Sequence, residues 1–188
     1  EGWWHGFARM DMFVLEDGST KICELNADTP SGQVECLVPR ELVAPRYPDL
    51  VDFNHEYEPR FWDLLLRMHR DRTGDDSEPR RAAILYPTDI PEDITLIRLY
   101  QRWFEERNIP VVLGSPMNLQ RTEDGGVALF GEPIDLVLRH YKTDWWGERP
   151  NVMVDDNPIP DPDPLEKELL ILLDAERNKK VTVVNPFG

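Results

Sequence analysis

Apolar and polar positions alternate along the first part of the chain. Residues 9–15 and 20–25 are predicted to be paired strands, because Asp17-Gly18 between them is a strong signal for a β-hairpin. A short helix is predicted within residues 31–44. A longer one is predicted within residues 57–71, where apolar side chains recur at helical spacing.

The pattern changes after residue 80. Continuous apolar runs, typical of strands covered on both faces, now alternate with amphipathic helical patterns. The predicted strands lie within 81–87, 109–114, 133–141 and 180–186, a second hairpin within 118–131, and the helices within 91–108 and 163–176. This alternation predicts an α/β fold with a mostly parallel, doubly wound, Rossmann-like sheet and helices on both faces. We expect residues 1–80, which carry the hairpin, and residues 81–188 to form one compact unit.

The connections add three expectations. The proline-rich residues 149–164 are predicted to cross the surface as a rigid loop, and Asp163 is predicted to cap the helix that follows. Doubly wound sheets bind ligands at the carboxyl ends of their strands, which here precede 86–89, 140–144 and 185–188. The chain has no GxGxxG and no GxxxxGK[ST] motif, so a simple Rossmann or P-loop nucleotide site is not supported.

Four polar residues interrupt the apolar pattern of the hairpin. A two-residue turn at Asp17-Gly18 would place Arg9 opposite Asn26 and Asp11 opposite Glu24, with all four side chains on one face. We call these four residues the polar quartet. The remaining positions on both faces are largely apolar, so both faces of the hairpin are expected to be buried.

Two interpretations of the polar quartet remain open. Directly opposed carboxylates destabilise a strand pair by up to ~1 kcal/mol, and the penalty grows with burial. Arg9 can compensate one carboxylate, whereas a divalent cation can compensate both. Asp11, Glu24 and the Asn26 carbonyl offer hard oxygen ligands, which suit Mg²⁺ better than Zn²⁺. A surface ion-pair ladder explains the same residues without a metal.

The loop after the second strand adds a possible anion site. Asp28, Thr29, Ser31 and Gly32 supply hydroxyls and free backbone N–H groups, and a helix opening at Ser31 can hold a carboxylate or phosphate oxygen. Cation ligands beside such a cradle are what phosphoryl transfer requires. This neighbourhood favours the metal interpretation over the ion-pair ladder.

Composition narrows the classes of partner. The net charge is −15 and no basic stripe is present, which argues against nucleic acid or an anionic membrane surface as a partner. Cys23 and Cys36 have neither metal-type nor disulfide-framework spacing, so we expect a cytoplasmic location. The four histidines are scattered and form no metal-binding pair.

The motifs resemble those of a known family. R-x-D at residues 9–11 and E-x-N-A-D-[ST]-x-[ST] at residues 24–31, followed by Glu35, resemble the glutathionylspermidine synthase family of ATP-grasp amide ligases. YKTDWWGE at 141–148 resembles a Trp-rich segment of that family more loosely. VTVVNPFG at 181–188 resembles the strand that precedes the family's ATP-binding module.

The resemblance implies a role for each motif residue. By this resemblance, Arg9 contacts the reacting phosphoryl group, and Arg9 and Asp11 also contact the nucleotide. The residues implied in binding Mg²⁺ are Asp11, Glu24 and Asn26, and those implied in binding substrate are Thr29, Ser31 and, for the amine, Glu148. Pro30 and Gly32 depart from the family loop, so the peptide need not be glutathione.

The implied activity is that of an ATP-dependent carboxylate–amine ligase. ATP would phosphorylate the carboxylate of a small peptide or thiol-peptide, and an amine or polyamine would displace the phosphate. The family's ATP-binding module follows the strand matched by 181–184, so we expect this chain to be the pre-ATP-grasp portion of a longer protein and to be inactive alone. The alternative is a non-catalytic module that binds a peptide or an amine. A divalent-metal hydrolase fits less well, because no His or Asp cluster supplies a second metal shell.

Overall fold

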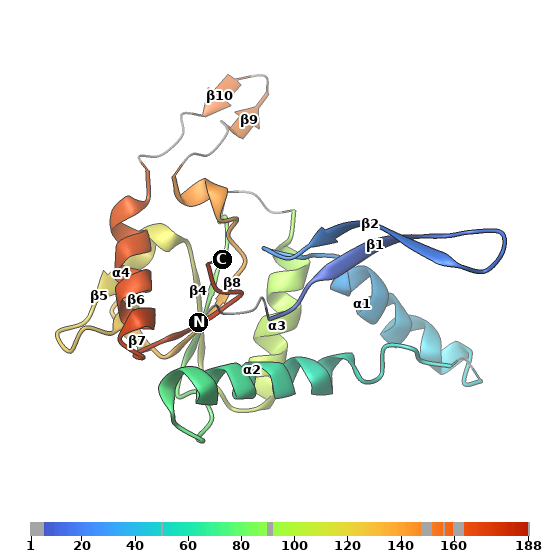
Figure 1. Cartoon of the computed structure of the whole chain (residues 1–188), viewed down its shortest axis with the longest axis horizontal. Coiled ribbons are helices and arrows are strands. Elements are labelled where there is room, and N and C mark those ends of the chain that lie inside the picture. Colours follow the sequence, from blue (N-terminus) through green and yellow to red (C-terminus); the bar gives the residue numbers. More distant parts are fainter. Residues whose placement is uncertain are drawn as a thin grey trace.

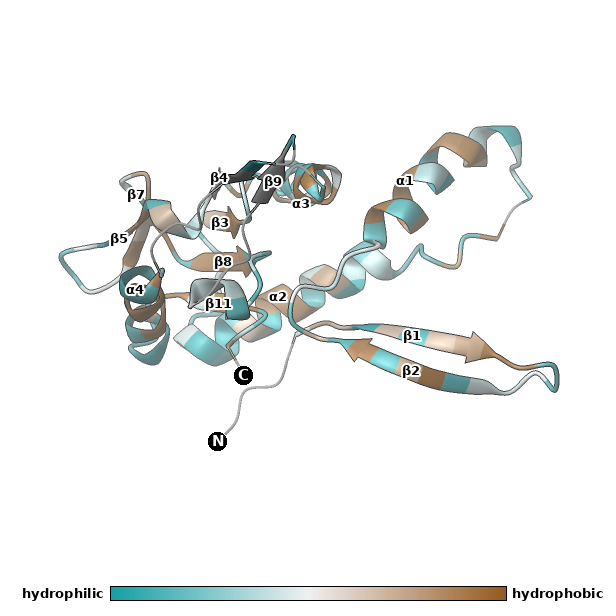
Figure 2. Ribbon diagram, turned by 90° about the horizontal axis from the view of Figure 1, so that it is seen from above, coloured by the Kyte–Doolittle hydropathy of each residue, from teal (hydrophilic) through white to brown (hydrophobic). Residues whose placement is uncertain are grey.

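A computed structural model describes residues 6–49, 51–89, 92–147, 152–155, 157–159 and 164–187. Its centre is a four-stranded parallel sheet in the order β11-β8-β3-β4, an order that can be followed in Figure 2. The strands are β3 (Ala82–Leu85), β4 (Val111–Gly114), β8 (Leu136–Arg139) and β11 (Thr182–Val184). They are short and almost wholly buried apart from β4, as the continuous apolar runs predicted.

Both faces of this sheet are covered. Ile84, Leu138 and Val184 face α2 (Tyr57–Thr73) and α3 (Ile94–Glu106), whose aromatic side chains form one core. The alternate positions, such as Leu85 and Val183, face a second core under α4 (Glu166–Arg177). An antiparallel sheet completes that second core, and its strands are β5 (Leu119–Arg121), β6 (Val127–Leu129) and β7 (Glu132–Ile134). A mixed α/β fold with helices on both faces of a parallel sheet is therefore confirmed.

Several predicted details differ. The sheets outside the central one are antiparallel, so the doubly wound, Rossmann-like assignment stays a prediction. Residues 149–164 contain a small hairpin, β9 (Val152–Val154) and β10 (Asn157–Ile159), instead of an irregular crossing. Helix α4 begins after Leu165, its N-cap, and the cap predicted at Asp163 lies outside the described residues. Short 3₁₀ turns occupy Ala44–Arg46, Pro116–Asn118 and Asp144–Trp146.

The N-terminal hairpin extends away from this body. It consists of β1 (Arg9–Val14) and β2 (Thr20–Asn26) and leads into α1 (Gln33–Val43), as Figures 1 and 2 show. Its apolar side chains are exposed on both faces, for example Met12 at 53%, Phe13 at 61% and Ile22 at 62%. The expectation that both faces are buried is therefore wrong. The physical reason is that only the two ends of the hairpin next to Arg9 and Asn26, which we call its roots, reach the body. No described element therefore covers the hairpin strands.

The division predicted between residues 1–80 and 81–188 stays a prediction. Helix α2, from the first part, shares a core with strands of the second part. Among the described helices, none combines the length and the apolar character that crossing a membrane would require.

Candidate functional site

The turn of the hairpin is one residue longer than predicted. The amide of Gly18 donates to the carbonyl oxygen of Leu15 at 2.9 Å, and the amide of Leu15 donates to the carbonyl oxygen of Ser19 at 2.9 Å. Gly18 has a φ of +79°, the left-handed conformation that closes a three-residue hairpin loop. Next to the turn, the pairing is therefore shifted by one residue from the predicted register, with Val14 opposite Thr20.

A β-bulge then restores the predicted pairing. Met12 lies opposite Ile22, but Asp11 lies opposite Glu24, so Cys23 is the extra residue of β2. Beyond the bulge, Arg9 lies opposite Asn26. Both predicted pairs are confirmed, although they result from two compensating irregularities and not from a regular two-residue hairpin.

The side chains of the polar quartet contact one another directly. The Arg9 guanidinium donates from Nε to Asp11 Oδ1 at 2.8 Å and from Nη2 to Asp11 Oδ2 at 3.2 Å. The Asn26 amide donates to Glu24 Oε1 at 3.0 Å and, more weakly, to Asp11 Oδ2 at 3.4 Å. The opposed carboxylates are thus bridged by an amide, and one of them is paired with the guanidinium.

The electrostatics follow from these contacts. The hydrogen bond from Arg9 lowers the pKa of Asp11, and the same bond raises the pKa of Arg9. The two side chains are 41% and 39% exposed, so water screens their attraction and the pair contributes little to stability. The quartet lies at an open surface, where a ligand can reach it.

The quartet fits a divalent cation in part. Asp11 and Glu24 supply carboxylate oxygens, and Asn26 would supply its carbonyl oxygen after a rotation of the amide, whose orientation follows from the hydrogen-bond network. Among the described residues, no group of three or more His, Cys, Asp or Glu side chains could hold a metal ion. Two carboxylates and an amide leave several positions of a six-coordinate Mg²⁺ to water or phosphate oxygens.

The loop after β2 brings the N-terminus of α1 to Arg9. Arg9 Nη1 donates to the carbonyl oxygen of Ser31 at 3.0 Å, and a Cβ on Gly32 would lie 3.6 Å from Arg9 Cδ. Gly32 is the N-cap, with a φ of +103° and no side-chain cap, so the first N–H groups of α1 remain available to an anion. The helix begins at Gln33, close to the opening predicted at Ser31.

The predicted substrate residues have different outcomes. Thr29 and Ser31 lie half-buried in this loop, and their hydroxyls form no hydrogen bond within the described part of the chain. Glu148 lies outside the described residues, so its predicted contact with the amine stays a prediction. A pocket of about 660 Å³ lies on the opposite side of the molecule, between β5 and α4, and does not involve the quartet.

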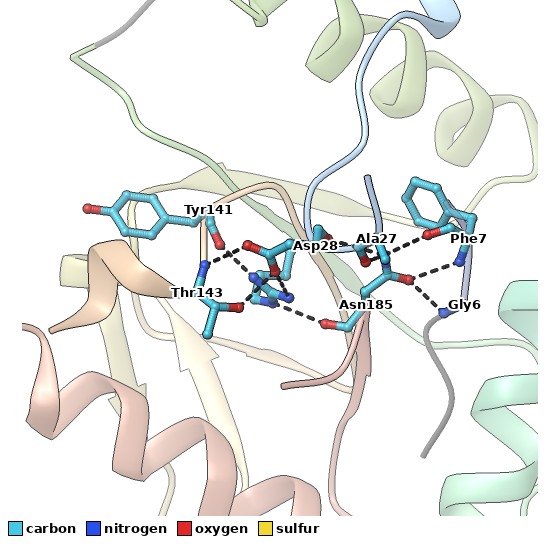
Figure 3. A network of polar contacts seen from close by, with 8 residues as sticks. Gly6, Phe7, Ala27, Asp28, Tyr141, Thr143 and Asn185 are labelled. Atoms are coloured by element: carbon cyan, nitrogen blue, oxygen red, sulfur yellow. Dashed lines mark hydrogen bonds and ion pairs between the residues drawn. The ribbon is translucent and has the colours of Figure 1, made fainter. Parts of the chain in front are cut away.

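Three polar residues lie together at the root of the hairpin, although the sequence placed only Asp28 in a candidate site, as part of the anion-binding loop, and gave Arg139 and Asn185 no role. Asp28, Arg139 and Asn185 form a connected network, drawn in Figure 3. Arg139 and Asn185 are 2% and 0% exposed and lie at the carboxyl ends of β8 and β11. The sequence feature that could have identified Arg139 and Asn185 is their position at the ends of buried apolar strands, because this is the edge where such sheets bind ligands.

Comparisons with known proteins add no relative to this picture. A scan against protein-family models finds no match, and a search of curated proteins finds none either. The resemblance to the glutathionylspermidine synthase family therefore depends on the motif residues themselves.

Proposed function

We propose that this chain presents Mg²⁺ and a carboxylate substrate in an ATP-dependent ligase that joins a carboxylate to an amine. The observation that carries the proposal is the bulge at Cys23, which gives up a regular strand ladder and brings Asp11 opposite Glu24 beside Arg9. Bulges recur next to active sites, where they redirect side chains. A hairpin with a merely structural role gains nothing from bringing two carboxylates face to face.

Each group of the site has a chemical task in this proposal. When bound, Mg²⁺ neutralises charge on phosphate oxygens. Arg9 donates to the transferring phosphoryl group, which requires its bond to Asp11 to loosen. The hydroxyls of Thr29 and Ser31 hold the peptide carboxylate beside the N-terminus of α1. Asp11, Glu24 and Asn26 hold the cation, and Glu148 contacts the amine.

The remaining parts of the proposal concern the wider protein. The central sheet belongs to a doubly wound, Rossmann-like pre-ATP-grasp unit, and ATP is bound mainly by an ATP-grasp half of the same protein. The substrates are a small peptide or thiol-peptide and an amine or polyamine. The free, exposed thiols of Cys23 and Cys36 suit a reducing compartment such as the cytoplasm.

Paramagnetic relaxation with Mn²⁺ tests the site in this chain. Mn²⁺ accepts the same oxygen ligands as Mg²⁺ and broadens the NMR signals of nearby amides. We expect selective broadening around Asp11, Glu24 and Asn26, and its loss in Asp11→Asn. Glu16→Gln removes an equal charge from the exposed tip of the same hairpin and should leave the broadening unchanged. Uniform weak broadening over all acidic patches would refute the site.

A non-catalytic module that binds a peptide or an amine is the second candidate. The observation that favours it is the complete pairing of Asp11 with Arg9 and the bridging by Asn26, which compensate the carboxylates without a cation. Under this alternative, Asp11→Asn weakens binding of the peptide or amine, and Mn²⁺ causes no selective broadening at the quartet.

A further inference from the structure

The buried side-chain amide of Asn185 forms hydrogen bonds to both roots of the hairpin. Asn185 Oδ1 accepts from the backbone amides of Gly6 at 2.7 Å and Phe7 at 3.0 Å, just before β1. Its Nδ2 donates to the carbonyl oxygens of Phe7 at 2.9 Å, Ala27 at 2.8 Å and Asp28 at 3.1 Å. Figure 3 shows Asn185 between the two chain segments. The two ends of the hairpin are therefore held by the residue that follows β11.

The buried side chain of Arg139 also holds the second root of the hairpin, through Asp28 after β2. The side chain of Arg139 is fully buried and pairs with Asp28, while its other nitrogens donate to the carbonyl oxygens of Tyr141 at 2.7 Å and Asn185 at 3.0 Å. Asp28 also accepts from the amide of Thr143 at 2.8 Å and from its hydroxyl at 2.7 Å. The Asp28 carboxylate thereby joins the loop after β2 to the loop after β8.

The polar contacts of the Arg139 and Asn185 side chains point the same way. Arg139 and Asn185 sit at the carboxyl ends of central strands, yet their polar atoms bond to loops and hairpin roots. Beyond the roots, the hairpin strands are exposed on both faces. The quartet lies at the end of the hairpin next to the roots, so the roots set where the quartet lies relative to the sheet edge.

We propose that Asp28, Arg139 and Asn185 are positioning residues that hold the quartet at a fixed orientation to the carboxyl edge of the central sheet. This inference rests on the proposed function in one respect, because the orientation matters only if the quartet acts together with a ligand at that edge. The residues do not touch the reacting groups; they act through the hairpin that carries Arg9 and Asp11.

The orientation can be measured by spin labelling of the 188-residue chain. Exposed Lys21 on β2 and exposed Arg177 on α4 are replaced by labelled cysteines, after Cys23→Ser and Cys36→Ser. We expect one narrow distance distribution in this background and a broad one when Asp28→Asn is added. Thr143→Val, which removes only the hydroxyl bond to Asp28, should broaden it to a smaller extent.

The matched control is Glu176→Gln. Glu176 accepts from Arg72 at 2.9 Å, and both side chains are nearly buried, but this pair joins α4 to α2 and does not touch the hairpin. It should lower the stability and leave the distance distribution narrow. An unchanged narrow distribution in both Asp28→Asn and Thr143→Val would overturn the proposal, as would equal broadening in Glu176→Gln.

Mn²⁺ separates this inference from the proposed function. In the wild-type chain, Mn²⁺ at the quartet should broaden the amide signal of Thr143 as well as those of Leu25 and Asn26. In Asp28→Asn, the signals of Leu25 and Asn26 should stay broadened while the effect at Thr143 is lost. If Mn²⁺ has no selective effect on the wild-type chain, the proposed function fails, and the spin-label distances alone decide whether the three residues position the hairpin.

Discussion

Replacing Asn185 with alanine removes the amide that holds both roots of the hairpin. The side chain is fully buried and makes five hydrogen bonds to backbone groups of Gly6, Phe7, Ala27 and Asp28. Alanine satisfies none of them. The cavity left behind is small, so the main loss comes from polar groups that no longer have a partner.

The magnitude follows from those groups. A buried donor or acceptor left without a partner costs about 1–3 kcal/mol. The hairpin roots are only partly buried, so some of the five groups will regain water. If two of them stay dry, Asn185→Ala lowers the free energy of unfolding by about 2–6 kcal/mol. Asn185→Asp should cost at least as much, because a carboxylate oxygen would then face three carbonyl oxygens.

Urea denaturation followed by circular dichroism measures this loss. Asn178→Ala is the matched control, since Asn178 is exposed at the end of α4 and should change the stability by less than about 0.5 kcal/mol. A loss below about 1 kcal/mol for Asn185→Ala would refute the claim that unpaired buried groups dominate. It would also remove Asn185 from the positioning network.

Three further predictions concern the Asp28 carboxylate, the Gly32 backbone and the activity of the purified chain. Burial raises the pKa of Asp28, but hydrogen bonds from Thr143 and Arg139 outweigh this effect and the net pKa is lowered. Asp28 therefore stabilises the fold above the ordinary pKa of aspartate, about 4, and this contribution disappears as the pH falls through the lowered value. Thermal unfolding against pH should show this acid-side loss in the wild type and less of it in Asp28→Asn. Gly32→Ala should lower the free energy of unfolding by about 1–3 kcal/mol in urea, because the φ of +103° is strained for alanine; an unchanged midpoint would contradict the described loop. The purified chain should release no ADP from ATP, because its sequence contains neither of the phosphate-binding motifs GxGxxG and GxxxxGK[ST]. Measurable ADP release would contradict the proposal that the chain is a pre-ATP-grasp portion.

The sequence predicted the main elements well where the apolar pattern is long and regular. The periodicity of residues 57–71 and the apolar runs around β3 and β8 correspond to described elements. The pairs Arg9–Asn26 and Asp11–Glu24 were also predicted, but the turn and the bulge at Cys23 were not. A local pattern around Asp17-Gly18 fits both two-residue and three-residue loops, and the two irregularities cancel in the register.

Two other failures have a common physical cause, which is dependence on partners far away in the sequence. Apolar residues on both faces of the hairpin indicate burial, but burial requires an element to cover them, and the described chain provides none. Arg139 lies at the end of an apolar run, where a charged residue is expected at the surface. Its burial depends on Asp28, more than a hundred residues earlier, and no local pattern predicts that pairing.

The kcat of the full-length protein in which we expect this chain to occur tests the ligase proposal most directly. Arg9→Ala, with its folding checked separately, should lower kcat by a factor on the order of 10² to 10³, as loss of one preorganised charge donor does. Arg9→Lys should restore little, because a lysine cannot reproduce the planar donor fork. A folded Arg9→Ala protein with a kcat near that of the wild type would show that the quartet is an ion-pair ladder, and the proposed function would be wrong.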